Sequence, residues 1–206
     1  MKRALILDLD NTIYPVSSIA DNLFAQFFEL LEQHPDLDPS IIHTAKIEIT
    51  RRPFQYVADD FNFSPSLKNK GIELLKTITY NEPMQPYPDY AHIRKIELDK
   101  FLVTTGFTNL QNSKVKQLGL AGDFKEIHIV DPEISTKTKQ DVFKELMDKY
   151  GYAPADLLVI GDDPLSEIQA ARSLNIETFL YDPNNKHPDA VSTYRGDNME
   201  QVLSLI

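Results

Sequence analysis

Two carboxylates and a hydroxyl follow a short apolar run near the start of the chain. The run at residues 4–7 ends at Asp8 and Asp10, and Thr12 lies two positions further on. An apolar run of this length is typical of a buried strand, and strand residues two apart point to the same side. Paired carboxylates can divide the work of a nucleophile and a general acid/base. Asp8 and Asp10 are therefore candidate catalytic residues, and Thr12 is a candidate loop-fixing hydroxyl.

Hydroxyls and ammonium groups follow two later parts of the chain. Thr104 and Thr105 come after the apolar run at 100–103, and Lys137 and Lys139 precede a helical pattern. A hydroxyl before a turn and a helix can bind phosphate together with backbone N–H groups. An ammonium can neutralise a phosphate and a nucleophile. We take these four residues as candidate phosphate ligands.

A third set of acidic residues follows the apolar run at 157–160. Asp162 and Asp163 come directly after Gly161, and Glu167 lies five positions beyond Asp162. Carboxylate oxygens are the hard ligands that Mg²⁺ prefers. The pattern predicts that Asp162 completes a Mg²⁺ site with Asp8.

The elements that must position these residues alternate along the chain. Strand-like runs lie at 4–7, 100–104, 126–130, 157–160 and 177–181, and helical patterns end or lie at 115–120, 141–150 and 165–174. Such alternation favours an α/β fold with βαβ units. We predict a Rossmann-like parallel sheet with helices on both faces and ligands at the carboxyl edge of its strands.

The segment at 15–85 breaks this pattern because it contains no convincing buried strand. A helical apolar face begins at Ile19, Ser40 is a candidate cap for a helix from Ile41, and 66–77 is a further helical pattern. We therefore predict a small helical cap at 15–85, inserted after the first strand into a core made of 1–14 and 86–206.

Composition limits the classes of protein that the chain can represent. With 206 residues, 42% hydrophobic residues and a net charge of -10, it reads as a globular protein that does not attract nucleic acid or anionic membranes. No apolar run is long enough for a membrane helix, and Asp8 and Asp10 interrupt the one stretch that resembles a signal peptide. Cysteine is absent, which excludes disulfides and thiol chemistry. We expect a cytoplasmic protein; the pattern leaves the oligomeric state open.

The chain resembles the haloacid dehalogenase (HAD)-like hydrolases, in their phosphatase branch with a helical cap of the first type. The resemblance rests on motifs that occur in the family's order: Asp8-Leu-Asp10-Asn-Thr12, Thr104-Thr-Gly106, a lysine at 137 or 139, and Gly161-Asp162-Asp163-Pro-Leu-Ser-Glu167. The text Asn-Thr-Ile-Tyr-Pro after Asp10 leans toward pyrimidine 5'-nucleotidase-like members.

The resemblance implies a mechanism and an activity. Asp8 would attack phosphorus to form an aspartyl-phosphate, and Asp10 would protonate the leaving oxygen and then activate water. Mg²⁺ would be held by Asp8, the carbonyl of Asp10 and Asp162, and Glu167 or Asp163 would support it through water. The substrate would be a small phosphomonoester, such as a nucleotide or sugar phosphate. A phosphotransferase or mutase, or a non-catalytic module that retains the fold, are the alternatives.

The chain departs from the family pattern at three positions. Thr105 stands where Asn is frequent, Glu167 stands where Asp is more usual, and the lysine is not followed by Pro. Counting back from Phe143 favours Lys137 as the active-site lysine, with Lys139 as the alternative.

Overall fold

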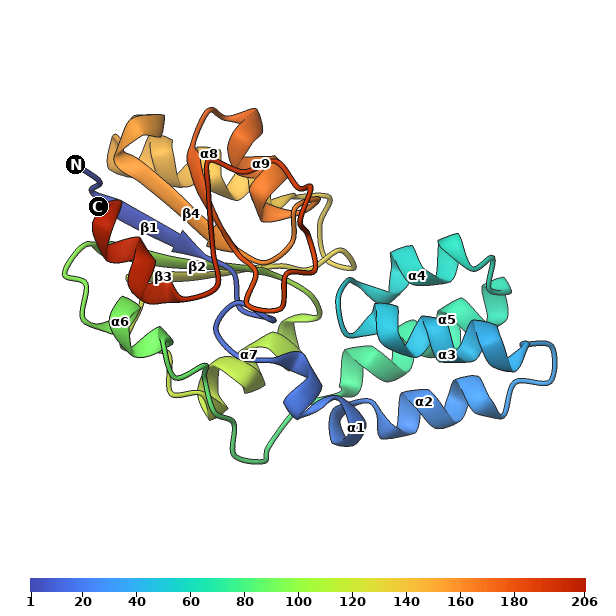
Figure 1. The fold of residues 1–206 in the computed structure, drawn as a ribbon. Coiled ribbons are helices and arrows are strands. Elements are labelled where there is room, and N and C mark those ends of the chain that lie inside the picture. The colour runs from blue at the N-terminus through green and yellow to red at the C-terminus, as the bar shows by residue number, and fades with distance from the viewer.

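A six-stranded parallel sheet forms the centre of the protein in a computed structural model that describes residues 1–206. The strands lie side by side in the order β3-β2-β1-β4-β5-β6 (Figure 1). Their bounds are β1 Ala4–Leu7, β2 Asp99–Thr105, β3 Glu126–Val130, β4 Leu157–Gly161, β5 Glu177–Tyr181 and β6 Tyr194–Gly196. The predicted α/β fold and its five strands are confirmed. The edge strand β6 was not predicted, because its three residues carry no apolar run.

The register of the sheet brings distant parts of the sequence to one edge. Leu7, the last residue of β1, lies opposite Leu102 of β2 and Ile160 of β4. Because all three strands run in the same direction, the residues that follow them emerge at the same carboxyl edge.

Helices cover both faces of the sheet (Figure 1). On one face lie α8 (Lys139–Tyr150) and α9 (Glu167–Ser173), and on the other lie α6 (Tyr90–Arg94), α7 (Thr108–Gln117) and a 3₁₀ helix at Met199–Ser204. Successive side chains of β1 point to opposite faces of the sheet. Ala4 and Ile6 belong to the core under α8, whereas Leu5 and Leu7 belong to the core on the opposite face.

The part of the chain between β1 and α6 forms a helical lobe, which we define as residues 16–77. It contains a 3₁₀ turn at Val16–Ser18 and the helices α1 Ala20–Leu23, α2 Ala25–Glu32, α3 Pro39–Ile49, α4 Phe54–Asp60 and α5 Pro65–Thr77. In Figure 1 these helices stand beside the sheet, next to α7. No strand occurs in the lobe.

Two details of the lobe differ from the sequence prediction. Helix α3 begins earlier than predicted, because Asp38 rather than Ser40 is its N-cap and accepts a hydrogen bond from the Ser40 N–H at 2.8 Å. Helix α4 was not predicted, since its seven residues are too few to show a clear period. The division of the chain at residues 15 and 85 stays a prediction.

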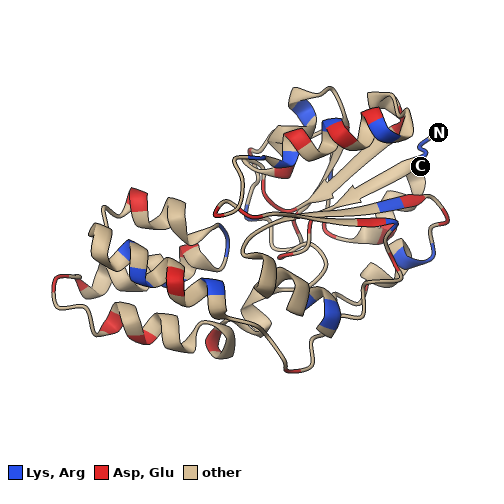
Figure 2. Ribbon diagram, turned by 180° about the vertical axis from the view of Figure 1, so that it is seen from behind, with Lys and Arg blue, Asp and Glu red and all other residues tan.

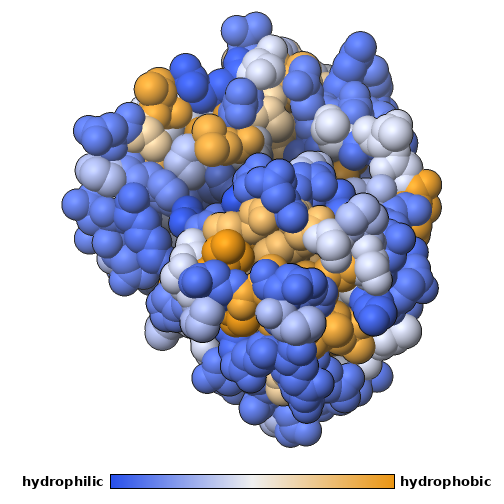
Figure 3. All heavy atoms as spheres, turned by 90° about the vertical axis from the view of Figure 1, so that its right-hand side faces the viewer, coloured by the Kyte–Doolittle hydropathy of each residue, from blue (hydrophilic) through white to orange (hydrophobic).

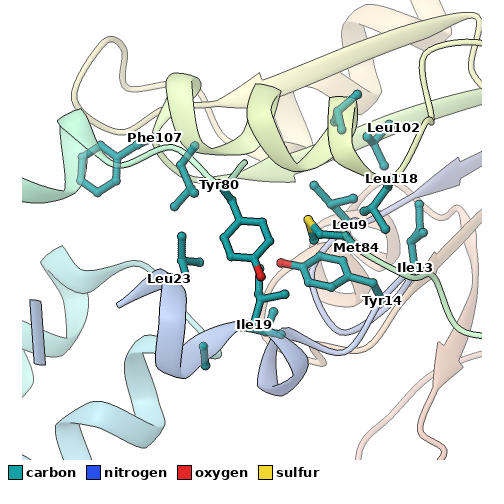
Figure 4. Close-up of a cluster of buried hydrophobic side chains, with 14 of the residues drawn as sticks. Leu9, Ile13, Tyr14, Ile19, Leu23, Tyr80, Met84, Leu102, Phe107 and Leu118 are labelled. Atoms are coloured by element: carbon teal, nitrogen blue, oxygen red, sulfur yellow. The ribbon is translucent and has the colours of Figure 1, made fainter. Parts of the chain in front are cut away.

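Lobe and sheet share one apolar core of 39 buried residues. Figure 4 shows its central part, where Tyr14 and Tyr80 meet among Leu9, Ile19 and Met84 beneath α7. The core is therefore continuous from the strands into α1. None of the helices is long and apolar enough to cross a membrane.

Candidate active site

A cavity of about 600 Å³ lies between the carboxyl edge of the sheet and the lobe. The sheet edge and the elements next to it contribute its polar floor: Asp8, Asp10, Thr104, Thr105, Lys114, Lys139, Asp162 and Glu167. Apolar side chains of the lobe and of α7 contribute the opposite wall: Val16, Phe24, Ile49, Phe54, Leu75, Phe107 and Leu110. In Figure 3, which faces the lobe side, apolar side chains gather near the middle of a largely hydrophilic surface.

Asp8 forms a buried ion pair at the floor of the cavity. Its Oδ1 atom lies 2.7 Å from Lys139 Nζ, which also lies 2.8 Å from Glu167 Oε2. Burial would lower the pKa of Lys139, but Asp8 and Glu167 outweigh burial and raise this pKa above its ordinary value. The ammonium is therefore charged, and it can neutralise both a nucleophilic carboxylate and a bound anion.

Three carboxylates beside this ammonium form a group suited to a cation. Oxygen atoms of Asp8, Asp162 and Glu167 all lie within 4.8 Å of one another. Burial is the main cause that raises the pKa of Asp8 to about 7 and that of Asp162 well above its ordinary value, and neighbouring carboxylates add to both shifts. One ammonium does not balance three acids, and hard oxygen ligands suit Mg²⁺. The residues present therefore fit a divalent cation.

The hydrogen bonds of these acids indicate which of them could hold the ion. Glu167 uses Oε2 for Lys139 and Oε1 for the Asp163 N–H at 2.8 Å. Asp162 receives one hydrogen bond, from Thr12 Oγ1 at 3.2 Å to its Oδ1. Asp8 and Asp162 are thus the side chains with free carboxylate oxygens, and Thr12 and Glu167 support them.

Gly161 makes room for this arrangement. A Cβ atom on Gly161 would lie 2.1 Å from Glu167 Oε1, which is closer than two such atoms can approach. The absence of a side chain at the end of β4 lets Glu167 reach back from the first residue of α9 to Lys139.

Asp10 is held by three donors, none of which was predicted. Its Oδ1 accepts hydrogen bonds from Tyr14 Oη at 2.5 Å and Lys114 Nζ at 2.8 Å, and its Oδ2 accepts one from Gln111 Nε2 at 2.9 Å. Burial works to raise the pKa of Asp10, but Lys114, Tyr14 and Gln111 outweigh it and lower this pKa below its ordinary value. Asp10 is therefore a fixed carboxylate in the free protein.

Thr104 and Thr105 lie at the end of β2 as predicted, and Gln111 joins Thr104 to Asp10. The Gln111 side chain donates from Nε2 to Thr104 Oγ1 at 2.7 Å. Gly106 follows with a φ of 153°, in the region that favours glycine. Helix α7 starts behind it, with the Thr108 N–H donating to Asp131 Oδ2 at 2.8 Å. Both threonines line the cavity.

The structure reverses the preference between the two lysines. Lys137 is about half exposed and pairs with Glu145 at 2.7 Å, although it lies at the rim of the cavity. Lys139 is the first residue of α8, and Thr138 and Asp141 cap this helix reciprocally. Counting residues back from Phe143 did not locate this helix start, and for this reason it favoured Lys137, whereas Lys139 is the lysine that contacts Asp8.

The sequence gives only a partial indication of the three partners of Asp10, which are Tyr14, Gln111 and Lys114. Gln111 and Lys114 are three residues apart and therefore share one face of α7. Polar residues at this spacing usually indicate a solvated face, whereas here both are buried. Only the position of α7 above the Asp10 loop explains why that face is polar.

Comparison with known proteins places the chain in a family. The family model described as haloacid dehalogenase-like hydrolase matches residues 2–175. The pyrimidine 5'-nucleotidase PynA of Streptococcus pneumoniae is 25% identical over 114 residues, which is 53% of this chain and 48% of that protein, so the match spans about half of this relative.

Two further relatives match over nearly their full length. The glyceraldehyde 3-phosphate phosphatase of Methanopyrus kandleri is 21% identical over 100% of this chain and 97% of that protein. The solved structure of the HAD-hydrolase YfnB of Bacillus subtilis, bound to magnesium, has a TM-score of 0.67 and 18% identity and covers 99% of this chain and 98% of its own. That structural likeness concerns the fold. Because the family model spans most of the chain and the site lies within the matched residues, the protein belongs to the haloacid dehalogenase-like hydrolases.

Proposed function

We propose that this hydrolase is a Mg²⁺-dependent phosphatase that cleaves a small phosphomonoester through an aspartyl-phosphate on Asp8. One observation carries the proposal. Asp8 lies at the cavity floor with Oδ1 fixed by Lys139 at 2.7 Å, and Asp10 is fixed separately beside it. A nucleophile and a proton carrier thus face the same cavity. Phosphoryl transfer depends mainly on such positioning and on neutralised charge.

In the first step a carboxylate oxygen of Asp8 attacks phosphorus. The bond from phosphorus to the ester oxygen breaks as the bond to Asp8 forms, and the leaving oxygen takes a proton from Asp10. Lys139 stabilises the charge on the phosphoryl oxygens. Thr104 and Thr105, which line the same cavity, are the proposed hydroxyl ligands of these oxygens. Mg²⁺ held by Asp8 and Asp162 would neutralise further negative charge on the phosphoryl group.

In the second step water attacks phosphorus and releases phosphate from Asp8, while Asp10 takes the proton of that water. Lys114 holds the pKa of Asp10 down against burial, so Asp10 is deprotonated in the free protein and available to accept this proton. For the acid role Asp10 must first take up a proton. The negative charge of a bound phosphate favours this uptake, because a nearby like charge raises a carboxyl pKa.

Asp10 also favours a phosphate ester over a halide as the substrate. A halide leaves without a proton, whereas an alkoxide leaving group requires one. The names of the nucleotidase and phosphatase relatives support the same reaction class, and the magnesium bound to YfnB supports the choice of metal.

We assign the lobe the role of a cap that closes over the phosphate. Several contacts join the lobe to the loops around the site. Among them, Asn11 Nδ2 donates to the Thr50 carbonyl at 3.4 Å, and Gln55 Nε2 donates to Glu133 Oε1 at 3.0 Å. Its apolar wall would exclude water from the reacting atoms. The substrate is thus a small phosphorylated metabolite that fits beneath the lobe.

Phosphate release from a panel of nucleotide, sugar and polyol phosphates tests the proposal. We expect release with Mg²⁺, loss of release with a chelator, and loss in Asp8→Asn at unchanged far-UV circular dichroism. Release that persists in Asp8→Asn would overturn the assigned nucleophile. No release from any ester, with Mg²⁺ bound and the protein folded, would favour a phosphotransferase or a non-catalytic role.

A further inference from the structure

Lys114 is a buried cation that the proposed reaction leaves only partly used. It is 3% exposed and lies on α7, at the part of the cavity that adjoins Asp10. Lysine carries three N–H donors. One of these N–H groups donates a hydrogen bond to Asp10 Oδ1 at 2.8 Å, and Nζ makes no other hydrogen bond to the protein. A buried ammonium with spare donors is costly unless another acceptor arrives.

The surroundings of Lys114 indicate what such an acceptor would be. The same cavity has an apolar wall that includes Val16, Phe107 and Leu110. The ring centroid of Tyr14 lies 5.9 Å from Nζ, and the Tyr14 hydroxyl already donates a hydrogen bond to Asp10. Asp10 is therefore the one protein acceptor that Lys114 Nζ contacts, and its remaining donors are available to a substrate oxygen.

The distance to Asp10 limits where on the substrate that acceptor lies. Asp10 contacts the leaving ester oxygen in the proposed reaction, and Lys114 Nζ is one hydrogen bond away from Asp10. Two oxygens on adjacent carbons in a gauche arrangement lie about as far apart as two hydrogen-bonded atoms. A pair of donors such as Asp10 and Lys114 matches a pair of oxygens on adjacent carbons.

We propose that Lys114 binds an oxygen on the carbon next to the one that carries the phosphate. The preferred substrates are then phosphomonoesters with a vicinal oxygen, as in polyol, sugar and hydroxy-acid phosphates, over simple alkyl phosphates. The inference rests on the proposed phosphatase function and adds the substrate class to it. Lys114 is thereby a specificity-determining residue.

Two matched esters measure this preference. 2-Hydroxyethyl phosphate and propyl phosphate have nearly the same shape and differ by a hydroxyl in place of a methyl group. We expect the wild-type kcat/KM to be about ten- to a hundredfold higher for the hydroxyl ester, which is the range for one hydrogen bond to a charged group. Equal values in the wild-type protein would overturn the inference. Hydrolysis of p-nitrophenyl phosphate, which lacks a vicinal oxygen, reports separately whether the proposed phosphatase function holds.

The variant Lys114→Met assigns the preference to this residue. Loss of Lys114 also disturbs Asp10, so the rate on both esters falls; the ratio between the two esters cancels that common loss. We expect the ratio to fall to near one in Lys114→Met. We expect it to be retained in Lys116→Met, which removes an exposed lysine of the same helix. A wild-type ratio in Lys114→Met would contradict the assignment.

A binding measurement covers the case in which Lys114→Met is too slow to assay. In an Asp8→Asn background, calorimetry compares the two esters with and without Lys114→Met, and the same loss of preference is expected. Phosphoglycolate and isobutyl phosphate form a second pair that distinguishes a carboxylate acceptor from a hydroxyl. A larger Lys114-dependent preference in this pair would indicate hydroxy-acid phosphates, and a smaller one would indicate polyol or sugar phosphates.

Discussion

At the residue scale, the site is built from side chains whose partners decide their chemistry. Asp8 and Asp10 are two positions apart, yet the pKa of Asp8 is raised to about 7, chiefly by burial, whereas that of Asp10 is lowered, chiefly by Lys114 acting against burial. In the free protein Asp10 is thus the more readily ionised of the two, and a cation bound beside Asp8 would lower the pKa of Asp8 and favour its nucleophilic carboxylate form. The sequence identified both acids, because they follow a buried strand directly. It did not reveal Lys114, whose burial depends on where its helix packs.

We assign the active-site ammonium to Lys139 rather than to Lys137, and substitution of each lysine tests this assignment. In Lys139→Met, Asp8 and Glu167 would lose their shared buried partner. We expect the free energy of unfolding to fall by about 3–5 kcal/mol, as when one partner of a buried ion pair is removed. Phosphate release should fall by at least about a hundredfold, because the phosphoryl charge loses its cation.

Lys137→Met is the matched control, since Lys137 is exposed and pairs with Glu145 at the surface. Its unfolding free energy should change by less than about 0.5 kcal/mol, and its activity should be close to that of the wild-type protein. Urea denaturation and a phosphate-release assay check both variants. A larger loss of activity in Lys137→Met than in Lys139→Met would show that the structure selects the wrong lysine.

At the element scale, the acidic residues of the site lie at or just after strand ends, and Lys139, which pairs with Asp8, lies at a helix start. The strands could be predicted because short apolar runs end abruptly at polar residues. Helix starts are less visible: Asp38 caps α3 where Ser40 was expected, and the capping box of Thr138 and Asp141 places Lys139 at the first position of α8. A shift of one or two residues at a helix start changes which side chain reaches the sheet edge.

The cap of α8 therefore affects activity as well as stability. In Thr138→Ala, the Asp141 N–H loses its acceptor at 3.2 Å and the turn that carries Lys139 frays. We expect a loss of about 1 kcal/mol in unfolding free energy. We also expect a drop in kcat/KM of up to about a hundredfold, because a misplaced cation no longer aligns Asp8.

Ser64→Ala provides the comparison. Ser64 caps α5 in the lobe through the corresponding single hydrogen bond, in which its Oγ accepts from the Leu67 N–H at 3.2 Å. The two variants should lose similar stability, but only Thr138→Ala should lose activity beyond the fraction that is unfolded. Equal activity losses in the two variants would refute a special role of the α8 cap.

At the scale of the whole molecule, the lobe and the sheet are joined through one core. Residues from both belong to the same buried cluster, and Tyr14 and Tyr80 lie where they meet (Figure 4). Charged side chains of both signs are interspersed over lobe and sheet (Figure 2). The sequence indicated a separate helical segment from its period and prolines. It could not show that this segment shares its core with the sheet, because such contacts join residues far apart in the chain.

A shared core predicts cooperative unfolding. Phe27 lies in the lobe, is fully buried and packs edge-on against Phe54 with ring centroids 4.8 Å apart. Phe27→Ala should lower the unfolding free energy by about 3–5 kcal/mol. It should also shift one transition that far-UV circular dichroism and tyrosine fluorescence report at the same midpoint. Separate midpoints for the two probes would mean that the lobe unfolds independently.

The central claim is that Asp8 carries the phosphoryl group. Its most direct test is to mix the protein with Mg²⁺ and a hydrolysed ester, quench in acid within a single turnover and map the peptides by mass spectrometry. We predict a phosphoryl adduct on the peptide that contains Asp8. The adduct should be absent in Asp8→Asn and longer-lived in Asp10→Asn, which lacks the base for the second step. Hydrolysis without an adduct, or an adduct on another residue, would contradict the account.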